Sequence, residues 1–265
     1  MEMNENIREN LSRAALASGL SFENMEKEFR LMDFMRRLFS ELERRGSKAA
    51  LFGGTALNKG YFLERQRFSK DLDIDGNEKE VASALEAFSR EFHITRLNLR
   101  PESPFENWRL RYGPHPWEEL LVDVGRRKPP PRAPLRKVEM HSLLEYHGYL
   151  VSPVPVPSYS LEFLLARKLV ALNRRVMGKD MYDSYFGLKL NPDRAELAKW
   201  LRILVKSEFQ EGLEEFISST IYWVKKADAK SESFQELLSS VPMPYRRSAA
   251  EMQNTIIFEL EKLME

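Results

Sequence analysis

The segment from Leu51 to Asp75 constrains the fold more than any other part of the chain. It reads LFGGTALNKGYFLERQRFSKDLDID, which predicts a short apolar strand, a glycine turn, a polar stretch and a second strand. Side chains two residues apart on a strand project from the same face, with Cα atoms about 6–7 Å apart. Asp71 and Asp73 have this spacing, so the pair can hold a divalent metal ion between them.

A glycine-rich turn, Gly53-Gly54-Thr55, follows the first strand directly. Glycine has no Cβ, so the backbone N–H groups of such a turn can approach phosphate oxygens closely. Ser69 lies two residues before Asp71 and shares its strand face, where its hydroxyl can bond a phosphate oxygen. Carboxylates for a metal beside a phosphate-binding turn are the minimum equipment for chemistry on a nucleoside triphosphate.

A third carboxylate, Asp123, stands in the otherwise apolar stretch LVDV. Burying an unpaired charge is costly, so this side chain must be paired, hydrogen-bonded or bound to a cation. Nucleotidyl transfer can use two metal ions about 3.5–4 Å apart, and three carboxylates usually hold them. We therefore predict that Asp71, Asp73 and Asp123 are the metal-binding and catalytic residues. Asp75 shares the face of Asp73 but lies at a turn, and it is the weaker candidate.

Calcium is an alternative ligand for the same carboxylates. The stretch Asp71–Gly76 matches the first half of an EF-hand loop, including the glycine at position six. Position twelve of such a loop requires a bidentate Glu, but Ala82 stands there. Leu72 and Ile74 also alternate with the acidic residues as they would in a strand, so the pattern favours a strand.

Three short blocks resemble the nucleotidyltransferase toxins of the AbiEii/AbiGii family, which belongs to the polymerase-β-like nucleotidyltransferase superfamily. The blocks are Gly53–Leu57, Arg67–Asp73 and Lys179-Asp180-x-x-Asp183. The resemblance implies that Gly53, Gly54 and Thr55 bind the β- and γ-phosphates of the nucleotide. Ser69 belongs to the signature of the family. The third carboxylate of the family lies in a short apolar strand, and the assignment to Asp123 follows that pattern.

A helical lysine, Lys168, flanks an apolar stripe in the second half of the chain. The resemblance implies that Lys168 reaches the triphosphate and that Asp180 orients Lys168 or the base of the nucleotide. Two simpler interpretations stay open. The lysine can pack its stem on the apolar stripe and extend its ammonium group into solvent. Asp180 and Asp183 can oppose the positive end of a helix dipole, and we expect Asp183 to be structural.

The resemblance implies an α+β fold, with a polymerase-β-like mixed sheet flanked by helices and then an all-helical C-terminal domain. We expect residues 1–157 to form the nucleotidyltransferase core and residues 158–265 the helical domain, with an extended linker at 151–160. Ser21 is expected to cap a helix that ends at about Arg45. Periodicity predicts further helices at 55–63, 78–92, 160–176, 179–189, 193–206, 209–226 and 245–264. The predicted strands are 49–52, 70–75, 108–112 and 120–124.

The activity implied by the resemblance is metal-dependent transfer of a nucleoside monophosphate from a nucleoside triphosphate to an acceptor hydroxyl. The cofactor would be Mg²⁺ or Mn²⁺, and the acceptor RNA, at the 3′ end of tRNA. The protein would be the toxin of a toxin–antitoxin pair, with an antitoxin as partner. Two alternatives stay open. One is a nucleotide- or RNA-binding module without transfer activity, and the other is transfer to a small molecule, as in aminoglycoside nucleotidyltransferases.

Composition limits these interpretations only weakly. The chain has 41 Lys and Arg against 40 Asp and Glu, so any nucleic-acid contact must come from a local basic surface. The basic, proline-rich stretch 126–132 is one such loop, and it is equally compatible with a solvated surface. Cysteine is absent and no apolar run approaches the roughly 20 residues of a membrane span, which favours a cytoplasmic protein. We expect Trp108, Tyr112 and Trp117 to lie in the core.

Overall fold

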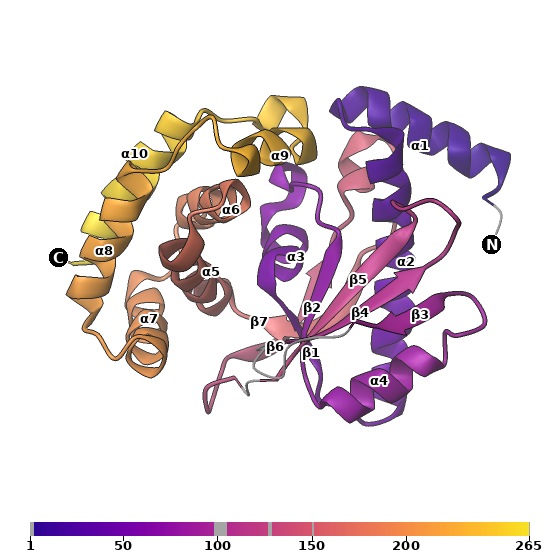
Figure 1. Ribbon diagram of the computed structural model, residues 1–265, viewed down its shortest axis with the longest axis horizontal. Helices are drawn as coiled ribbons and strands as arrows, with labels where there is room; N and C mark the ends of the chain where they lie inside the picture. The colour runs from indigo at the N-terminus through magenta and orange to yellow at the C-terminus, as the bar shows by residue number, and fades with distance from the viewer. Residues whose placement is uncertain (1–2, 98–104, 127–128, 150, 265) are drawn as a thin grey trace.

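A five-stranded mixed sheet organises the first half of the fold in the computed structural model, which describes residues 3–97, 105–126, 129–149 and 151–264 (Figure 1). The strand order is β1-β2-β5-β4-β3, with β2 and β5 parallel and the other neighbours antiparallel. The strands are β1 (Ala50–Phe52), β2 (Asp71–Asp75), β3 (His93–Arg96), β4 (Phe105–Arg111) and β5 (Glu119–Gly125). Because residues 71–75 form a strand of this sheet, the EF-hand alternative is wrong.

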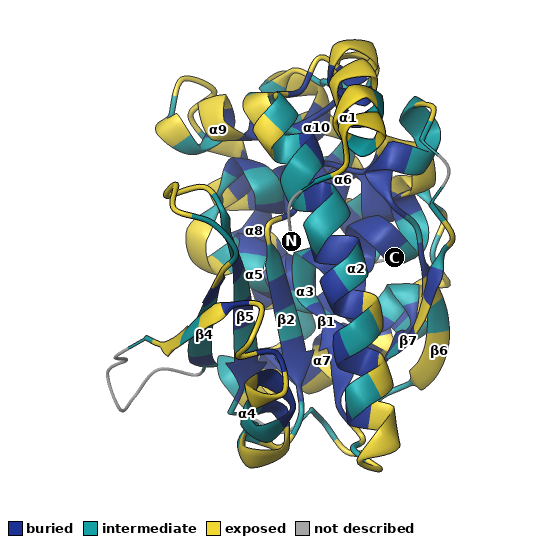
Figure 2. Cartoon of the chain, turned by 90° about the vertical axis from the view of Figure 1, so that its right-hand side faces the viewer, coloured by how far each residue is buried: buried dark blue, intermediate teal, exposed yellow. Residues whose placement is uncertain are grey.

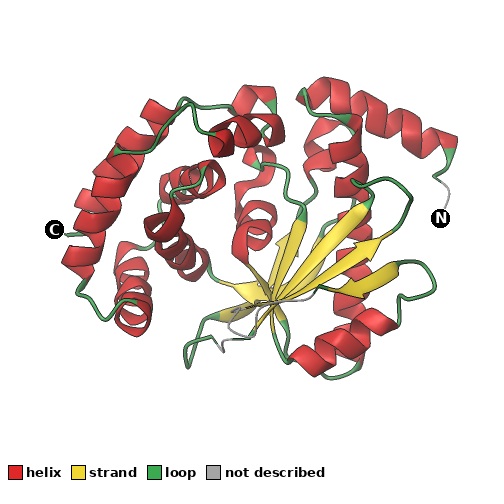
Figure 3. Cartoon of the chain, in the orientation of Figure 1, coloured by secondary structure: helices red, strands yellow, loops and turns green. Residues whose placement is uncertain are grey.

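Helices cover both sides of the sheet (Figure 3). On one side, α2 (Phe22–Arg44) and α4 (Glu78–Glu86) pack against β5, and α1 (Glu5–Ser18) packs against α2. Ser21 caps α2 as predicted, accepting a hydrogen bond from the Asn24 N–H. On the other side, α3 (Gly53–Leu57) packs against β1 and β2, and η1 (Asn58–Phe62) and η2 (Leu63–Arg65) follow it. The helix predicted at 78–92 ends at Glu86, and turns lead on to Phe92.

A second, two-stranded sheet pairs β6 (Leu135–Met140) with β7 (Val154–Tyr159). The stretch expected to be a linker therefore contains a strand, and Ser158 Oγ joins it to β1 by donating to the Leu51 carbonyl at 2.8 Å. Prolines at 155 and 157 suggested a linker because they lack N–H donors. Since backbone N–H groups alternate in direction along a strand, prolines two residues apart remove donors from one edge only, and the other edge can still pair.

Helices make up the remainder of the fold, as the periodicity predicted. They are α5 (Leu161–Arg175), α6 (Gly178–Lys189), α7 (Arg194–Glu208), α8 (Leu213–Lys225), α9 (Glu232–Ser240) and α10 (Ala249–Glu261), with η3 (Leu143–His147) and η4 (Met243–Tyr245) as short turns. The prediction did not include β3, β6, α1 and α9. No helix within the described ranges is long and apolar enough to span a membrane.

One hydrophobic core extends from the sheet into the C-terminal helices (Figure 2). Leu38 from α2, Leu72 from β2, Leu165 from α5 and Ile256 from α10 all belong to it and are fully buried. The predicted division at residue 157 falls within β7, and it stays a prediction. The polar residues that interrupt this core beside β2 form the candidate site.

Two of the three aromatic residues expected in the core do pack against it, namely Trp108 and Tyr112. Trp117 is 45% exposed, so its predicted place in the core is wrong. The difference follows from position, because Trp117 stands in the turn between β4 and β5.

Candidate active site

The three predicted carboxylates lie on one face of the sheet. Asp73 and Asp123 are direct partners in the parallel pairing of β2 with β5, so their side chains point to the same side. Asp71, which lies opposite Leu121, is two residues before Asp73 and shares that face. The spacing argument from the sequence and the observed strand register therefore give the same arrangement.

Burial and neighbouring negative charge raise the pKa of two of these carboxylates, Asp73 and Asp123. Burial, reinforced by the charges of Asp123 and then Asp71, raises the pKa of Asp73 to about 7. Burial also raises the pKa of Asp123, with a hydrogen bond from Asn107 opposing the rise and Asp71 adding to it. None of the three forms an ion pair with a Lys or Arg in the part of the chain that the structure describes. Such a cluster of like charges attracts a divalent cation.

The donor set agrees with a hard metal ion. Asp71 Oδ1 is a buried oxygen without a hydrogen-bond partner, which is the state expected of a ligand atom. The Asn107 amide donates to Asp123 Oδ1 and fixes the orientation of that carboxylate. Carboxylate oxygens are the ligands that Mg²⁺ and Mn²⁺ prefer. Among the described residues, no three acidic or histidine side chains already converge on one metal position, so these residues supply the donor chemistry without a preformed cage.

The glycine turn lies directly against the Asp73 carboxylate. Gly53 has φ of +73°, and a Cβ placed on it would lie 1.9 Å from Asp73 Oδ2. Only glycine combines this backbone conformation with such a close approach. A Cβ on Gly54 would instead lie 2.7 Å from Arg67 Nη2, on a different set of side chains. The two glycines therefore bring the turn against two separate polar groups.

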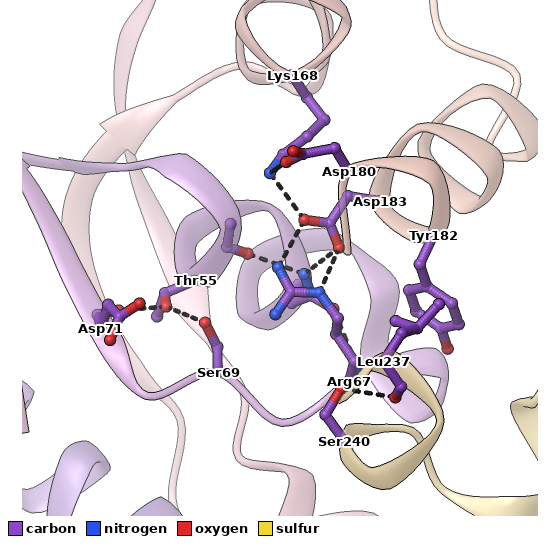
Figure 4. A network of polar contacts seen from close by, with 12 residues as sticks. Thr55, Arg67, Ser69, Asp71, Lys168, Asp180, Tyr182, Asp183, Leu237 and Ser240 are labelled. Atoms are coloured by element: carbon purple, nitrogen blue, oxygen red, sulfur yellow. Dashed lines mark hydrogen bonds and ion pairs between the residues drawn. The ribbon is translucent and has the colours of Figure 1, made fainter. Parts of the chain in front are cut away.

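A chain of hydroxyl groups links the turn to β2 (Figure 4). Thr55 Oγ1 donates to the Asp71 carbonyl at 2.5 Å, and Ser69 Oγ lies 2.6 Å from Thr55 Oγ1. Because Thr55 has only one hydroxyl proton, Ser69 must donate to Thr55. Both hydroxyl groups are buried and already engaged, so Ser69 would have to turn its proton outward to donate to a phosphate oxygen.

Behind Gly54 lies a buried ion network that contains Lys168 (Figure 4). Lys168 Nζ is 2.9 Å from Asp180 Oδ1 and 3.0 Å from Asp183 Oδ2. Arg67 donates two hydrogen bonds to the Asp183 carboxylate, at 2.9 and 2.7 Å. Lys168 is only 7 % exposed. Its ammonium group is therefore committed to two carboxylates, and neither the snorkelling interpretation nor an open contact with solvent describes it.

The charges of this network hold the acidic members ionised. Burial alone would raise the pKa of Asp180, but Lys168 and Arg175 lower it to about 2. Burial would also raise the pKa of Asp183, but the charges of Arg67 and Lys168 outweigh burial and lower that pKa. The structural role expected for Asp183 agrees with these contacts. The nucleotide-binding roles of Lys168 and Asp180 stay predictions.

A further contact attaches the beginning of β2 to the C-terminal helices. The Phe68 N–H donates to the Ser240 carbonyl at the end of α9, at 2.7 Å. Arg67, one residue earlier, reaches Asp183 of α6. The backbone that leads into Asp71 is thus fixed by two consecutive residues, one through its side chain and one through its main chain.

Comparison with known proteins gives the family. The family model described as "Nucleotidyl transferase AbiEii toxin, Type IV TA system" matches residues 34–258. The chain belongs to this family. Membership confirms the resemblance found in the sequence and makes the protein a nucleotidyltransferase of the AbiEii toxin family.

Solved structures confirm the fold. MenT4, a nucleotidyltransferase toxin from Mycobacterium tuberculosis H37Rv, matches with a TM-score of 0.67 at 18% identity, over 97% of this chain and 89% of that one. JHP933 from Helicobacter pylori matches with a TM-score of 0.52 at 18% identity, over 92% and 93% of the two chains. No curated protein sequence matches the chain.

The structure adds two residues to the site of this AbiEii-family protein that the sequence analysis did not select. Asn107 contacts Asp123 only through the pairing of β4 with β5, and no sequence motif marks it. Lys179 begins the Lys-Asp-x-x-Asp block, in which only the carboxylates were interpreted as candidates for a role in the site. Burial and the nearby charge of Arg67 lower the pKa of Lys179, whereas the charge of Asp71 raises it. Lys179 makes no ion pair within the described ranges.

Proposed function

We propose that this AbiEii-family protein transfers a nucleoside monophosphate from a nucleoside triphosphate to a hydroxyl group of RNA, at the 3′ end of tRNA. Asp71, Asp73 and Asp123 would hold Mg²⁺ or Mn²⁺. One observation carries the proposal: these carboxylates share a sheet face and lack cationic partners among the described residues, and one of them, Asp73, lies against Gly53 of the glycine turn. A buried acidic group of this kind must be neutralised by a proton or a cation, and a divalent metal ion can neutralise several carboxylates at once.

The reaction would exchange a phosphoanhydride bond of the triphosphate for a phosphodiester bond to the acceptor. The acceptor oxygen bonds to the α-phosphorus, the bond from that phosphorus to the bridging oxygen of the β-phosphate breaks, and the acceptor hydroxyl loses its proton. The metal, when bound, would acidify that hydroxyl and neutralise the departing pyrophosphate. The Gly53–Gly54 turn and Ser69 would bind the β- and γ-phosphates through N–H and O–H donors.

The buried network would act by positioning. Lys168, Asp180 and Asp183 join α5 to α6 behind the glycine turn. Their charges are satisfied within the protein, so their contribution to nucleotide binding would pass through the position of Gly54. The charge of Lys168 also lowers the pKa of Asp73, against the effect of burial, which supports its place beside the carboxylates.

The family name gives the proposal its biological context. The family is that of a toxin from a type IV toxin–antitoxin system, so a nucleoside triphosphate substrate and a cognate antitoxin are implied. With tRNA as acceptor, the reaction would take place in the cytoplasm.

The proposal is tested by an incorporation assay. Each labelled nucleoside triphosphate is offered with Mg²⁺ and, in turn, total tRNA, bulk protein or small hydroxyl metabolites. The wild type is compared with Asp71→Asn and Asp73→Asn, which remove charge without changing shape. Asp228→Asn, in an exposed loop, is the matched control.

Label that enters tRNA with wild type and the control, but with neither site variant, would support the proposal. Label that enters only small metabolites would replace the acceptor and keep the chemistry. Metal-dependent triphosphate binding without transfer to any acceptor would refute the proposal and leave a nucleotide-binding module.

A further inference from the structure

Arg175, the last residue of α5, connects the buried ion network to the protein surface. Its Nε lies 2.7 Å from Asp180 Oδ2 and its Nη2 lies 3.2 Å from Asp180 Oδ1. The Arg175 side chain is 49% exposed, whereas the side chains of Arg67, Lys168, Asp180 and Asp183 are at most 8% exposed. Arg175 is therefore the member of this network that a ligand can reach from solvent.

The network carries one more positive than negative charge. Arg67 and Lys168 already balance its two carboxylates, Asp180 and Asp183, which are buried and held ionised. Arg175 adds a third cation, and Asp180 is its only ion-pair partner among the residues that the structure describes. Since a balanced buried network does not need this further cation, the surplus charge indicates an anion outside the network.

Asp180 occupies one edge of the Arg175 guanidinium group and leaves the other edge open. The occupied edge consists of Nε and Nη2. Nη1 has no hydrogen-bond partner in the part of the chain that the structure describes, and Nη2 carries a second proton. The open edge therefore presents two coplanar N–H donors, which is the geometry that matches two oxygens of a phosphate group.

A continuous series of contacts joins this guanidinium group to the glycine turn. Lys168 Nζ binds Asp180 Oδ1 at 2.9 Å (Figure 4), and Arg175 Nη2 binds the same oxygen at 3.2 Å. A Cβ on Gly54 would lie 3.7 Å from Lys168 Nζ, while the preceding glycine lies against Asp73. The glycine turn therefore lies between the Asp73 carboxylate and the group of cations to which Arg175 belongs.

The turn that follows Arg175 fixes its backbone. Val176 has φ of +38°, a left-handed conformation that is unfavourable for a β-branched residue. Its side chain packs against the core, and its N–H donates to the Leu172 carbonyl at 3.0 Å. The Gly178 N–H donates to Ser233 Oγ of α9 at 3.3 Å. Strain of this kind persists only where surrounding contacts enforce it, and it is concentrated at functional sites.

We propose that Arg175 binds the β- and γ-phosphates of the nucleoside triphosphate through the open edge of its guanidinium group. Lys168 and Asp180 act as positioning residues that hold Arg175 in place. The contact with the triphosphate that the sequence resemblance assigned to Lys168 is thus made by Arg175, because Lys168 is committed to two carboxylates.

This inference rests on the proposed function and deepens it, since it assigns a protein cation to the leaving group. When the bond to the α-phosphorus breaks, negative charge develops on the departing pyrophosphate. A guanidinium group that is already fixed in position stabilises this charge without having to reorganise.

The test measures phosphate binding apart from transfer. Binding of inorganic tripolyphosphate in excess Mg²⁺ is followed by calorimetry, because this probe has no base and does not depend on which nucleotide is preferred. Arg175→Gln is compared with Arg174→Gln, since Arg174 is 45% exposed and pairs instead with Glu208 at 2.6 Å. Arg175→Lys keeps the charge beside Asp180 but lacks the planar pair of donors. Urea unfolding establishes that each variant is folded.

We expect Arg175→Gln to bind tripolyphosphate about 10- to 100-fold more weakly than wild type, the usual range for hydrogen bonds between charged groups. Arg174→Gln should bind as wild type does, and Arg175→Lys should lie between wild type and Arg175→Gln. In transfer assays, Arg175→Gln should raise KM for the nucleoside triphosphate and leave KM for the acceptor RNA unchanged.

Two results would overturn the inference. One is equal binding of tripolyphosphate by Arg175→Gln and Arg174→Gln. The other is wild-type binding by Arg175→Lys, because a charge beside Asp180 would then be sufficient and Arg175 would not contact the phosphates through two donors.

The inference and the proposed function can fail independently. Tripolyphosphate binding that depends on Arg175, without nucleotide transfer to any acceptor, would refute the proposed function and retain the phosphate contact. Transfer with the same KM for the nucleoside triphosphate in Arg175→Gln and Arg174→Gln would refute the phosphate contact and retain the chemistry.

Discussion

Replacing Asp183 by Asn tests the assignment of the buried network most directly. The substitution keeps the shape of the side chain but removes the carboxylate that Arg67 contacts through two hydrogen bonds. Lys168 keeps Asp180 as a partner, whereas Arg67 loses its ion pair while its side chain stays 7% exposed. A buried guanidinium without a counter-charge is then left in the core.

The size of the effect follows from that burial. Removing one partner of a buried ion pair costs about 3–5 kcal/mol, a large part of the roughly 5–15 kcal/mol by which a typical domain is stable. Asp180→Asn should cost less, about 1.5–3 kcal/mol. The reason is that Arg175, one of the two partners of Asp180, has a side chain 49% exposed and can return to water.

Urea unfolding followed by circular dichroism and by tryptophan fluorescence gives these free energies. With an m-value of about 3 kcal/mol/M, Asp183→Asn should shift the midpoint by about 1 M or more. Asp33→Asn, which removes a surface partner of Arg37 at 3.4 Å, is the control and should stay within about 0.5 kcal/mol of wild type. If Asp183→Asn were as stable as this control, the network would not hold α6 to the β2 lead-in, and the reasoning would be wrong.

Three further predictions follow from the site. Gly53→Ala should abolish metal-dependent transfer, because the new Cβ would lie 1.9 Å from Asp73 Oδ2. Gly46→Ala is the control and should retain activity, since Gly46 also has a positive φ but a Cβ there would have nothing within 4 Å. Transfer assays of the two variants side by side decide this. Mg²⁺ affinity measured by calorimetry should weaken as pH falls from 8 to 6, because protons compete for Asp73, whose pKa is about 7, and a pH-independent affinity would contradict this. The pKa of Asp180 is lowered to about 2, so its ion pairs stabilise the fold fully above about pH 4. Roughly 2 kcal/mol of the free energy of unfolding is lost as the pH falls through about 2. Acid unfolding of Asp180→Asn should therefore depend less on pH in that range.

Local periodicity was sufficient to predict that the candidate carboxylates of β2 lie on one face. Side chains alternate along any strand, so Asp71 and Asp73 had to share a face. The apolar surroundings of Asp123 marked it as a buried charge that needs a partner. The glycine turn was recognisable because only a residue without Cβ can bring the backbone so close to another group.

Partners that arrive from distant elements could not be predicted in the same way. A lysine beside an apolar stripe is compatible with either solvent or a buried ion pair, and the choice for Lys168 depends on two carboxylates from the next helix. Asn107 is meaningful only through its strand register. Trp117 differs from Trp108 by lying in the turn, a boundary that composition does not mark.

The two consecutive contacts at Arg67 and Phe68 have a mechanical consequence. They attach the segment that precedes β2 to α6 and α9, so those helices determine where the strand with the candidate carboxylates begins. A displacement of α9, caused by a substitution or a bound partner, would move Phe68. Asp71 lies only three peptide units further along the chain, so its position would change too. The position of the candidate carboxylates therefore depends directly on the C-terminal helices.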